Sequence, residues 1–155
     1  TAPAVKGYSF TIIRDMNHDG VPELLYNPKF SGSAQQPWTV YTYKKGKVKK
    51  MGMVSGKLYT ISGNKKQYKF EAWVGVGART AGYATFGKNK IAIKTESQYD
   101  GWPTNYYLKG KKTSEAKYNR YMKKFRKSMT AKRALKAIDT YKIKWDAKKV
   151  KSIVS

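Results

Sequence analysis

The stretch from residue 8 to residue 26 reads Tyr8-Ser-Phe-Thr-Ile-Ile-Arg-Asp-Met-Asn-His-Asp-Gly-Val-Pro-Glu-Leu-Leu-Tyr26 and carries the clearest local pattern in the chain. Residues 8–14 are β-branched and aromatic, and residues 23–26 form a short apolar run, so each segment predicts a strand. The loop over residues 15–23 contains three of the nine acidic residues of the chain. The pattern therefore predicts two strands joined by a loop with its own chemistry.

The loop spaces its oxygen-bearing side chains at alternate positions. Asp15, Asn17 and Asp19 occupy positions 1, 3 and 5, and Gly20 follows at position 6. Ca²⁺ takes six to eight oxygen ligands, and side chains with this spacing curl a loop around one ion. Glycine supplies the sharp turn because it adopts positive φ without steric strain. The spacing therefore predicts a calcium loop.

This loop would close differently from an EF-hand. An EF-hand has a bidentate Glu at position 12, where this chain has Tyr26. Glu23 would have to close the site instead, with Val21 contributing its backbone carbonyl at position 7. The same residues could alternatively bond to their own backbone in an Asx-rich hairpin turn. The only histidine, His18, lies in the loop at a position that directs its side chain outward.

Two segments resemble known sequences. The loop resembles the D-x-N-x-D-G-x-x-[DE] calcium loops of integrin β-propeller repeats, and more closely the DINGDGxPEL segment of secreted proteins from Gram-positive gut bacteria. Tyr106-Tyr-Leu-Lys-Gly-Lys-Lys-Thr-Ser-Glu-Ala-Lys-Tyr118 resembles the YYLNGKKVSKxxY strand-to-helix junction of the same bacterial proteins. The first resemblance implies a secreted or cell-surface protein with one structural Ca²⁺. The ligands that it implies are Asp15, Asn17, Asp19, Val21 (through its carbonyl) and Glu23.

Length and composition indicate one folded domain over residues 1–155. Hydrophobic residues make up 40% of the chain, with four Trp and thirteen Tyr, which argues against disorder despite a net charge of +24. No apolar run approaches the ~20 residues of a membrane-spanning helix. Cysteine is absent, which excludes disulfides, a cysteine nucleophile and thiolate metal sites.

Catalysis has little support in the sequence. With one histidine and no cysteine, a His–Ser–Asp or Cys–His set cannot be built unless His18 serves in it. Glu71 with Glu96 or Asp100 could form a glycosidase-type pair if the fold brings the carboxyl groups close. An ion pair explains Glu71 more simply, because it lies in the middle of a predicted strand among lysines. We therefore expect that the protein is not an enzyme.

The basic charge predicts an anionic partner. The chain has 33 Lys and Arg against nine Asp and Glu, which attracts polyanions. Only five of the basic residues are arginine, which is favoured for base readout and phosphate forks, and the lysines are spread along the sequence. These features favour polyanionic wall material such as teichoic acid, or a protein partner, over nucleic acid. The charge could also serve only to keep the fold solvated.

Two tryptophans beside prolines are candidates for binding a sugar. Trp38 follows Pro37, and Trp102 precedes Pro103. Aromatic rings that remain exposed offer a flat apolar face on which sugars stack. Most aromatic residues at strand spacing lie in a core, so both residues are candidates only if they are exposed.

Further strands follow from alternating polarity and turn residues. Asn27-Pro28 predicts a break after the first hairpin, and Lys44-Lys-Gly-Lys47 predicts a tight turn. Gly75, Gly77 and Gly82 predict bulges or a close approach of the backbone. The remaining strands are predicted at residues 38–43, 48–54, 58–61, 66–76, 83–86, 90–95 and 105–109.

The period becomes helical after residue 114. Ser114 is a suitable N-cap, and the negative charge of Glu115 suits the first turn. The apolar stripe of this helix comprises Tyr118, Tyr121, Met122, Phe125 and Met129. Thr130 predicts the start of a second helix, and residues 146–154 predict a third. The predicted fold class is α+β, with a twisted antiparallel sheet over residues 8–109 and helices from residue 114 packed on it.

These features predict a monomeric, non-catalytic module that is secreted or attached to the cell surface. We expect one structural Ca²⁺ and a basic surface for polyanionic wall material or a protein partner. The alternatives are a nucleic-acid-binding domain and an enzyme acting on wall polymers.

Overall fold

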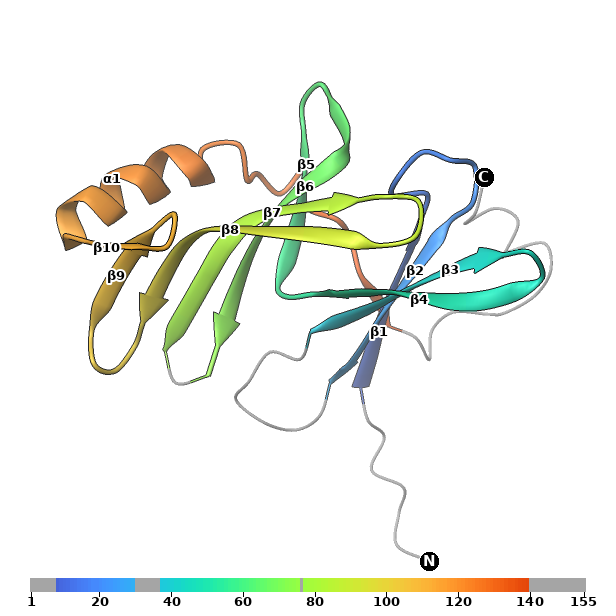
Figure 1. The fold of residues 1–155 in the computed structure, drawn as a ribbon, viewed down its shortest axis with the longest axis horizontal. Coiled ribbons are helices and arrows are strands. Elements are labelled where there is room, and N and C mark those ends of the chain that lie inside the picture. Colours follow the sequence, from blue (N-terminus) through green and yellow to red (C-terminus); the bar gives the residue numbers. More distant parts are fainter. Residues whose placement is uncertain (1–7, 30–36, 76, 140–155) are drawn as a thin grey trace, which may run out of the picture.

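The computed structural model describes residues 8–29, 37–75 and 77–139, which form two antiparallel sheets and one α-helix (Figure 1). The first sheet has the strand order β11-β1-β2-β3-β4, and the second has the order β10-β9-β8-β7-β6-β5. The strands of the first sheet are β1 (Tyr8–Arg14), β2 (Glu23–Lys29), β3 (Trp38–Lys44), β4 (Lys47–Val54) and β11 (Ile138–Asp139). The strands of the second sheet are β5 (Lys57–Ile61), β6 (Asn64–Val74), β7 (Ala78–Phe86), β8 (Ile91–Asp100), β9 (Asn105–Leu108) and β10 (Lys111–Thr113). The helix, α1, spans Glu115–Arg126.

The α+β prediction is confirmed only in its coarse features. The strands are antiparallel, and a helix follows them in the chain. The prediction of a single sheet over residues 8–109 is wrong, because the strands divide into a five-stranded and a six-stranded sheet. Alternating polarity predicts individual strands but does not specify which strands share a sheet. The described part of the chain is therefore mostly β, with one helix.

The hairpin predicted around residues 8–26 is confirmed, and its second strand is longer than predicted. β1 pairs with β2 along its full length, and Pro28 lies inside β2 opposite Ser9. The predicted strand break at Asn27 and Pro28 is therefore wrong. β3 pairs with β2 only over Leu24–Tyr26, so the described chain gives Pro28 no second strand as a neighbour. Proline cannot donate to a ladder and is therefore found at positions of this kind, where a strand has a neighbour on one side only.

The predicted turn at Lys44 to Lys47 is confirmed. Lys45 and Gly46 connect β3 to β4, and both have positive φ, at 50° and 75°. Two residues with positive φ match the twist of the flanking strands and so favour a two-residue hairpin turn. The turn brings the lysines at the end of β3 and the start of β4 together at one end of the first sheet.

The two sheets share a hydrophobic core. Leu25 and Val40 of the first sheet have no exposed surface and lie in the same cluster as Tyr68 and Phe86 of the second sheet. Tyr68 and Phe86 pack edge to face, with ring centroids 5.3 Å apart. Burial of an apolar side chain of this size contributes about 1.5–3 kcal/mol. This shared core fixes the position of the loop between β1 and β2 relative to the second sheet.

Helix α1 forms where the sequence predicts it and covers the other face of the second sheet (Figure 1). The Ser114 hydroxyl accepts a 3.3 Å hydrogen bond from Lys117 N and so caps the helix. Tyr83 and Ala84 are neighbours in β7, yet Tyr83 packs beneath the helix whereas Ala84 lies in the core between the sheets. The buried residues of the predicted stripe are Tyr118, Met122 and Phe125.

The second helix predicted from Thr130 is wrong. The residues that follow Thr130 form a turn and then run along the edges of both sheets. Leu135 N donates a 2.9 Å hydrogen bond to Leu58 O on β5, and Ile138 lies in β11 beside β1. The edge of a sheet exposes unpaired backbone N–H and C=O groups. Pairing with these groups stabilises this segment more than a weak helical pattern would. The third predicted helix, residues 146–154, lies outside the described residues.

A β-bulge in β8 shapes both faces of the second sheet. Ala81 pairs with Ser97, and Gly82 pairs with Thr95, which leaves Glu96 as the extra residue. A Cβ on Gly82 would lie 2.0 Å from a backbone oxygen of β8, which confirms the close backbone approach predicted at this glycine. A bulge redirects side chains and increases the local twist of a sheet.

The bulge directs Glu96 and Ser97 toward α1. Ser97 Oγ lies 3.0 Å from the sulfur of Met122, and Tyr121 Oη donates a 3.1 Å hydrogen bond to Glu96. Glu96 is only 4% exposed and forms a 2.9 Å ion pair with Lys94. Burial raises the pKa of Glu96, but the bonds from Lys94 and Tyr121 outweigh it and hold the pKa below its ordinary value. The carboxylate thus ties the bulge to the helix.

Replacing Glu96 with glutamine should make the free energy of unfolding depend less on pH in acid. Because the pKa of Glu96 is lowered in the folded protein, its contribution is complete above the ordinary carboxyl pKa and is lost as the pH falls below about 4.3. The free energy of unfolding, measured in urea at several pH values, should therefore fall less steeply in Glu96→Gln than in the wild type. Lys123→Gln, which alters an exposed residue of α1 and removes no carboxyl group, is the control and should keep the wild-type slope. Equal slopes in all three proteins would contradict this role of Glu96.

Candidate metal centre

The loop between β1 and β2 is packed against the second sheet and does not project freely into solvent. Met16 is completely buried in the shared core, and its carbonyl accepts a 3.0 Å hydrogen bond from Tyr68 Oη on β6. Asn17 is 1% exposed, and its Nδ2 donates a 3.0 Å hydrogen bond to Gly87 O in the turn between β7 and β8. These contacts join the loop to β6 and to the β7–β8 turn, both of which follow it far along the chain.

The predicted ligand side chains at positions 1, 3 and 5 accept hydrogen bonds from backbone amides of the loop. The two carboxylate oxygens of Asp15 accept bonds from Asp19 N at 3.1 Å and Gly20 N at 3.0 Å. Asn17 Oδ1 also accepts from Asp19 N at 3.0 Å, and Asp19 Oδ1 accepts from Val21 N at 2.9 Å. Gly20 has a φ of 87°, which confirms the predicted glycine turn. These bonds are those of the Asx-rich turn that the sequence left open as an alternative to a metal site.

Glu23 differs from the other predicted ligands because it is completely buried. Its Oε2 accepts a 2.8 Å hydrogen bond from Met16 N, whereas its Oε1 is buried without a hydrogen-bond partner in the described chain. The Thr42 hydroxyl lies near enough to favour the ionised carboxylate but does not reach hydrogen-bond geometry with Oε1. Burial raises the pKa of Glu23, and the charges of Asp19 and Asp15 raise it further. The loop thus ends in a carboxylate that has no cationic partner among the described residues.

Four of the five predicted ligand residues lie in the loop between β1 and β2, and the fifth, Glu23, is the first residue of β2. Within the described ranges, however, no group of three or more His, Asp or Glu side chains is close enough to hold a metal ion. An ionised carboxylate has about four lone-pair positions, so one that bonds an amide can still coordinate a cation. The donor set fits Ca²⁺ in its chemistry, because every donor is an oxygen. The metal stays a prediction.

The carboxyl groups considered for catalysis are in separate settings. Glu71 forms an ion pair with Arg126 of α1, with 3.1 and 3.0 Å hydrogen bonds from Arg126 Nε, as the simpler interpretation of Glu71 predicts. Glu96 bonds to Lys94 and Tyr121. β7 lies between the strands of Glu71 and Glu96, so their backbones are about two strand spacings, or roughly 10 Å, apart.

The two candidate sugar-binding tryptophans have opposite environments. Trp38 is 8% exposed in the shared core, and its Nε1 donates a 2.9 Å hydrogen bond to Gly56 O. Its ring is covered by protein, so we do not pursue Trp38 as a ligand contact. Trp102 is 88% exposed in the turn between β8 and β9. His18 is exposed, as predicted.

Two lysine-rich turns that are distant in the sequence lie side by side. The side chain of Lys44, next to the β3–β4 turn, donates a hydrogen bond to Asn89 in the β7–β8 turn. Both hairpins extend toward the same side of the molecule (Figure 1). Together the turns and adjacent strand ends form what we call the lysine surface, which consists of Lys44, Lys45, Lys47, Lys49, Lys50, Lys88 and Lys90. Sequence reasoning missed this surface because no local signal predicts contact between segments so far apart.

Comparison of the chain with protein-family models, with curated proteins and with solved structures finds no match. Among the described residues, no helix is both long and apolar enough to cross a membrane.

Proposed function

We propose that this protein is a non-catalytic, polyanion-binding module that is secreted or attached to the cell surface. The lysine surface binds a phosphate-rich wall polymer such as teichoic acid, and the loop over residues 15–23 holds one structural Ca²⁺. The observation that carries the proposal is the hydrogen bond from Lys44 to Asn89, which joins two lysine-rich turns. The resemblance of the loop to segments of secreted Gram-positive proteins supports this setting.

The charge of the lysine surface fits a flexible polyanion. Neither residues 44–50 nor residues 87–90 contain an acidic residue, and all the lysines of the surface except the half-buried Lys44 are exposed. Exposed lysines act as mobile point charges that neutralise phosphates without requiring a fixed geometry. Such a surface suits a polymer with regularly spaced charges better than a partner that must be read group by group.

Calcium has a specific role next to this surface. The loop carries three carboxyl groups and contacts the β7–β8 turn through the bond from Asn17 to Gly87 O. A bound Ca²⁺ neutralises part of that negative charge and gives a cation to the Glu23 oxygen, which has no hydrogen-bond partner among the residues that the structure describes. Both effects favour an ordered β7–β8 turn and the approach of a polyanion to Lys88 and Lys90.

Removing charge from the lysine surface should weaken binding to purified Gram-positive walls. The variant replaces Lys47, Lys49, Lys88 and Lys90 with glutamine and leaves Lys44 in place. With about 1 kcal/mol for each lysine near an anionic surface, the four substitutions should cost about 4 kcal/mol and lower the affinity roughly a thousandfold. The dependence of binding on salt should also become shallower, because fewer counterions are released. Sedimentation with walls at several salt concentrations measures both changes.

The matched control removes four exposed lysines from β10 and α1. It replaces Lys111, Lys112, Lys117 and Lys123 with glutamine, so that both variants lose the same charge. The proposal requires the control to bind nearly as well as the wild type and requires walls stripped of teichoic acid to bind neither protein. Equal losses in both variants would mean that only the total charge matters. Tight, sequence-selective binding to DNA or RNA at physiological salt would instead establish a nucleic-acid-binding domain.

A further inference from the structure

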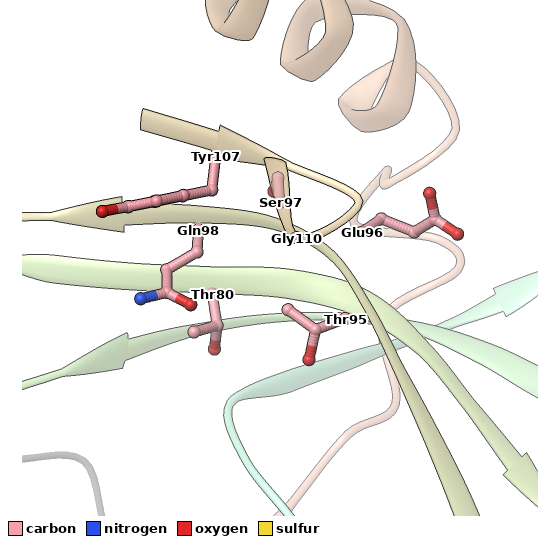
Figure 2. A pocket seen from close by; sticks show the side chains of 7 residues that line it. All are labelled: Thr80, Thr95, Glu96, Ser97, Gln98, Tyr107 and Gly110. Atoms are coloured by element: carbon pink, nitrogen blue, oxygen red, sulfur yellow. The ribbon is translucent and has the colours of Figure 1, made fainter. Parts of the chain in front are cut away.

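A hollow lies on the second sheet where neither the first sheet nor α1 covers it. Its volume is about 360 Å³, and its lining consists of Thr80, Thr95, Glu96, Ser97, Gln98, Tyr107 and Gly110. In Figure 2 the side chains of Thr80, Thr95 and Gln98 point to the same side of the sheet, and the Tyr107 ring lies beside Gln98. The site is separate from both the loop and the lysine surface.

The register of the strands explains why these side chains lie together. Ala72, Thr80, Gln98 and Tyr107 are cross-strand partners in one row that runs across β6, β7, β8 and β9. Residues directly opposite each other in a sheet share a face. The row therefore places a hydroxyl, a carboxamide and a phenol on three adjacent strands.

Small residues and the bulge leave room on this part of the sheet. Gly82 pairs with Thr95 in the next row and has no side chain, and Ala72 at the end of the first row has only a methyl group. Small residues leave room above the backbone, and the bulge increases the local twist. The Glu96 carboxylate points away from the Thr80 and Thr95 side chains (Figure 2) and bonds to Lys94 and Tyr121.

The chemistry of the lining favours a neutral, polyhydroxylated ligand. None of the lining residues is Lys or Arg, although the chain has 33 of them, and the one charged lining residue, Glu96, has its carboxylate bonded to Lys94 and Tyr121. Hydroxyl groups of Thr and Tyr both donate and accept hydrogen bonds, as do the amide of Gln and the hydroxyls of a sugar. The Gln98 amide is oriented by a 2.9 Å bond from its Nε2 to Asp100 Oδ1. The ring of Tyr107 adds an apolar face on which a pyranose can stack.

We propose that this hollow is a binding site for a neutral saccharide, with hydrogen bonds from Thr80, Thr95 and Gln98 and stacking on Tyr107. The site goes beyond the binding of polyanions, because it selects for hydroxyl groups and not for charge. A module with both sites contacts a wall or matrix at two chemically different places.

The test titrates gluco-, xylo-, manno- and chito-oligosaccharides into the full chain and follows backbone amide shifts by NMR. We expect one class of oligosaccharide to bind and to shift the amides of β7, β8 and β9. In the double variant Thr80→Val and Thr95→Val, which keeps the shape of both side chains and removes both hydroxyls, the affinity should fall about tenfold or more. Tyr107→Ala should cause a similar loss by removing the ring.

Matched controls separate the site from the fold and from the lysine surface. Tyr43→Ala removes a tyrosine that is 57% exposed on β3 and should leave saccharide binding unchanged. The fourfold lysine variant of the wall-binding test should also bind the saccharide normally, so the two proposals can fail independently. The proposal is overturned if no oligosaccharide of the panel binds, or if binding survives both hollow variants while their melting temperatures match that of the wild type.

Discussion

Replacing Phe125 with alanine should lower the free energy of unfolding by about 3–5 kcal/mol, the usual cost of truncating a buried Phe. Phe125 is 4% exposed at the centre of the contact between α1 and the second sheet. Its ring packs edge to face with Tyr83 at 5.6 Å, and the ammonium group of Lys69 lies 4.5 Å from its centroid. Truncation removes these contacts and leaves a cavity that the helix cannot fill without moving.

Denaturation in urea measures this change, and two variants make it specific. Lys123→Ala alters an exposed residue of the same helix and should change stability by less than about 0.5 kcal/mol. Phe125→Leu keeps most of the buried volume and should lose clearly less than Phe125→Ala. A loss in Phe125→Ala as small as in Lys123→Ala would mean that the packing of α1 on the second sheet does not depend on Phe125.

The helix shows how far local sequence signals reach. The N-cap at Ser114 and the stripe that includes Met122 and Phe125 predict α1 and its buried face. They do so because capping and a 3.6-residue period are local properties. The segment after Thr130 has a weaker helical pattern. It pairs instead with the edge of β5, which lies far away in the sequence. A weak local helix propensity is overridden where pairing with a distant strand provides backbone hydrogen bonds.

The division into two sheets could not be predicted for a similar reason. Alternation gives β3, β4, β5 and β6 the same kind of pattern, although the first two belong to one sheet and the last two to the other. Gly56, between β4 and β5, approaches the chain so closely that a Cβ would lie 2.1 Å from Glu71 O. The sequence marks Gly56 only as one glycine among 13. The change of sheet becomes apparent only from the pairing of the strands.

The candidate site was predictable in its residues but not in its surroundings. The spacing from Asp15 to Glu23 identifies the loop and its turn at Gly20, because those features are local. The burial of Glu23 and the bond from Asn17 to Gly87 O depend on how the loop packs on the second sheet. The lysine surface and the hollow on the second sheet depend entirely on contacts or register between strands, and no motif in the chain predicts them.

Chelation of calcium should lower the melting temperature of the protein, and added Ca²⁺ should restore it. A ligand that binds only the folded state stabilises it by about 2.7 kcal/mol at a hundredfold excess over its Kd. The effect should be large in this chain because Ca²⁺ also supplies a partner for the buried oxygen of Glu23 that has none in the described part of the chain. Thermal unfolding followed with chelator, with Ca²⁺ and with Mg²⁺ measures the shift, and Mg²⁺ should restore less stability because it holds its waters more tightly.

Substitutions in the loop separate the loss of metal from the loss of hydrogen bonds. Asp15→Ala and Asp19→Ala should abolish the response to Ca²⁺, and Asn17→Ala should weaken it. Asp15→Asn keeps an oxygen that can accept from a loop amide but removes the charge, so it should lose most of the calcium response at a smaller structural cost. Asp100→Asn, in β8, removes a carboxyl group far along the chain from the loop and should keep the full response.

The outcome with Glu23→Gln decides between the metal loop and the metal-free Asx turn. If Ca²⁺ binds, the variant should lose the calcium response, because a neutral amide replaces the carboxylate that closes the site. Without a metal, the same variant should be at least as stable as the wild type, because it removes a buried charge that has no cationic partner among the described residues. A wild-type melting temperature that is the same in chelator and in Ca²⁺ would show that the bonds from Asp19 N, Gly20 N and Val21 N hold the loop by themselves. The loop would then be a structural turn, and the polyanion surface would have to function without a cation beside it.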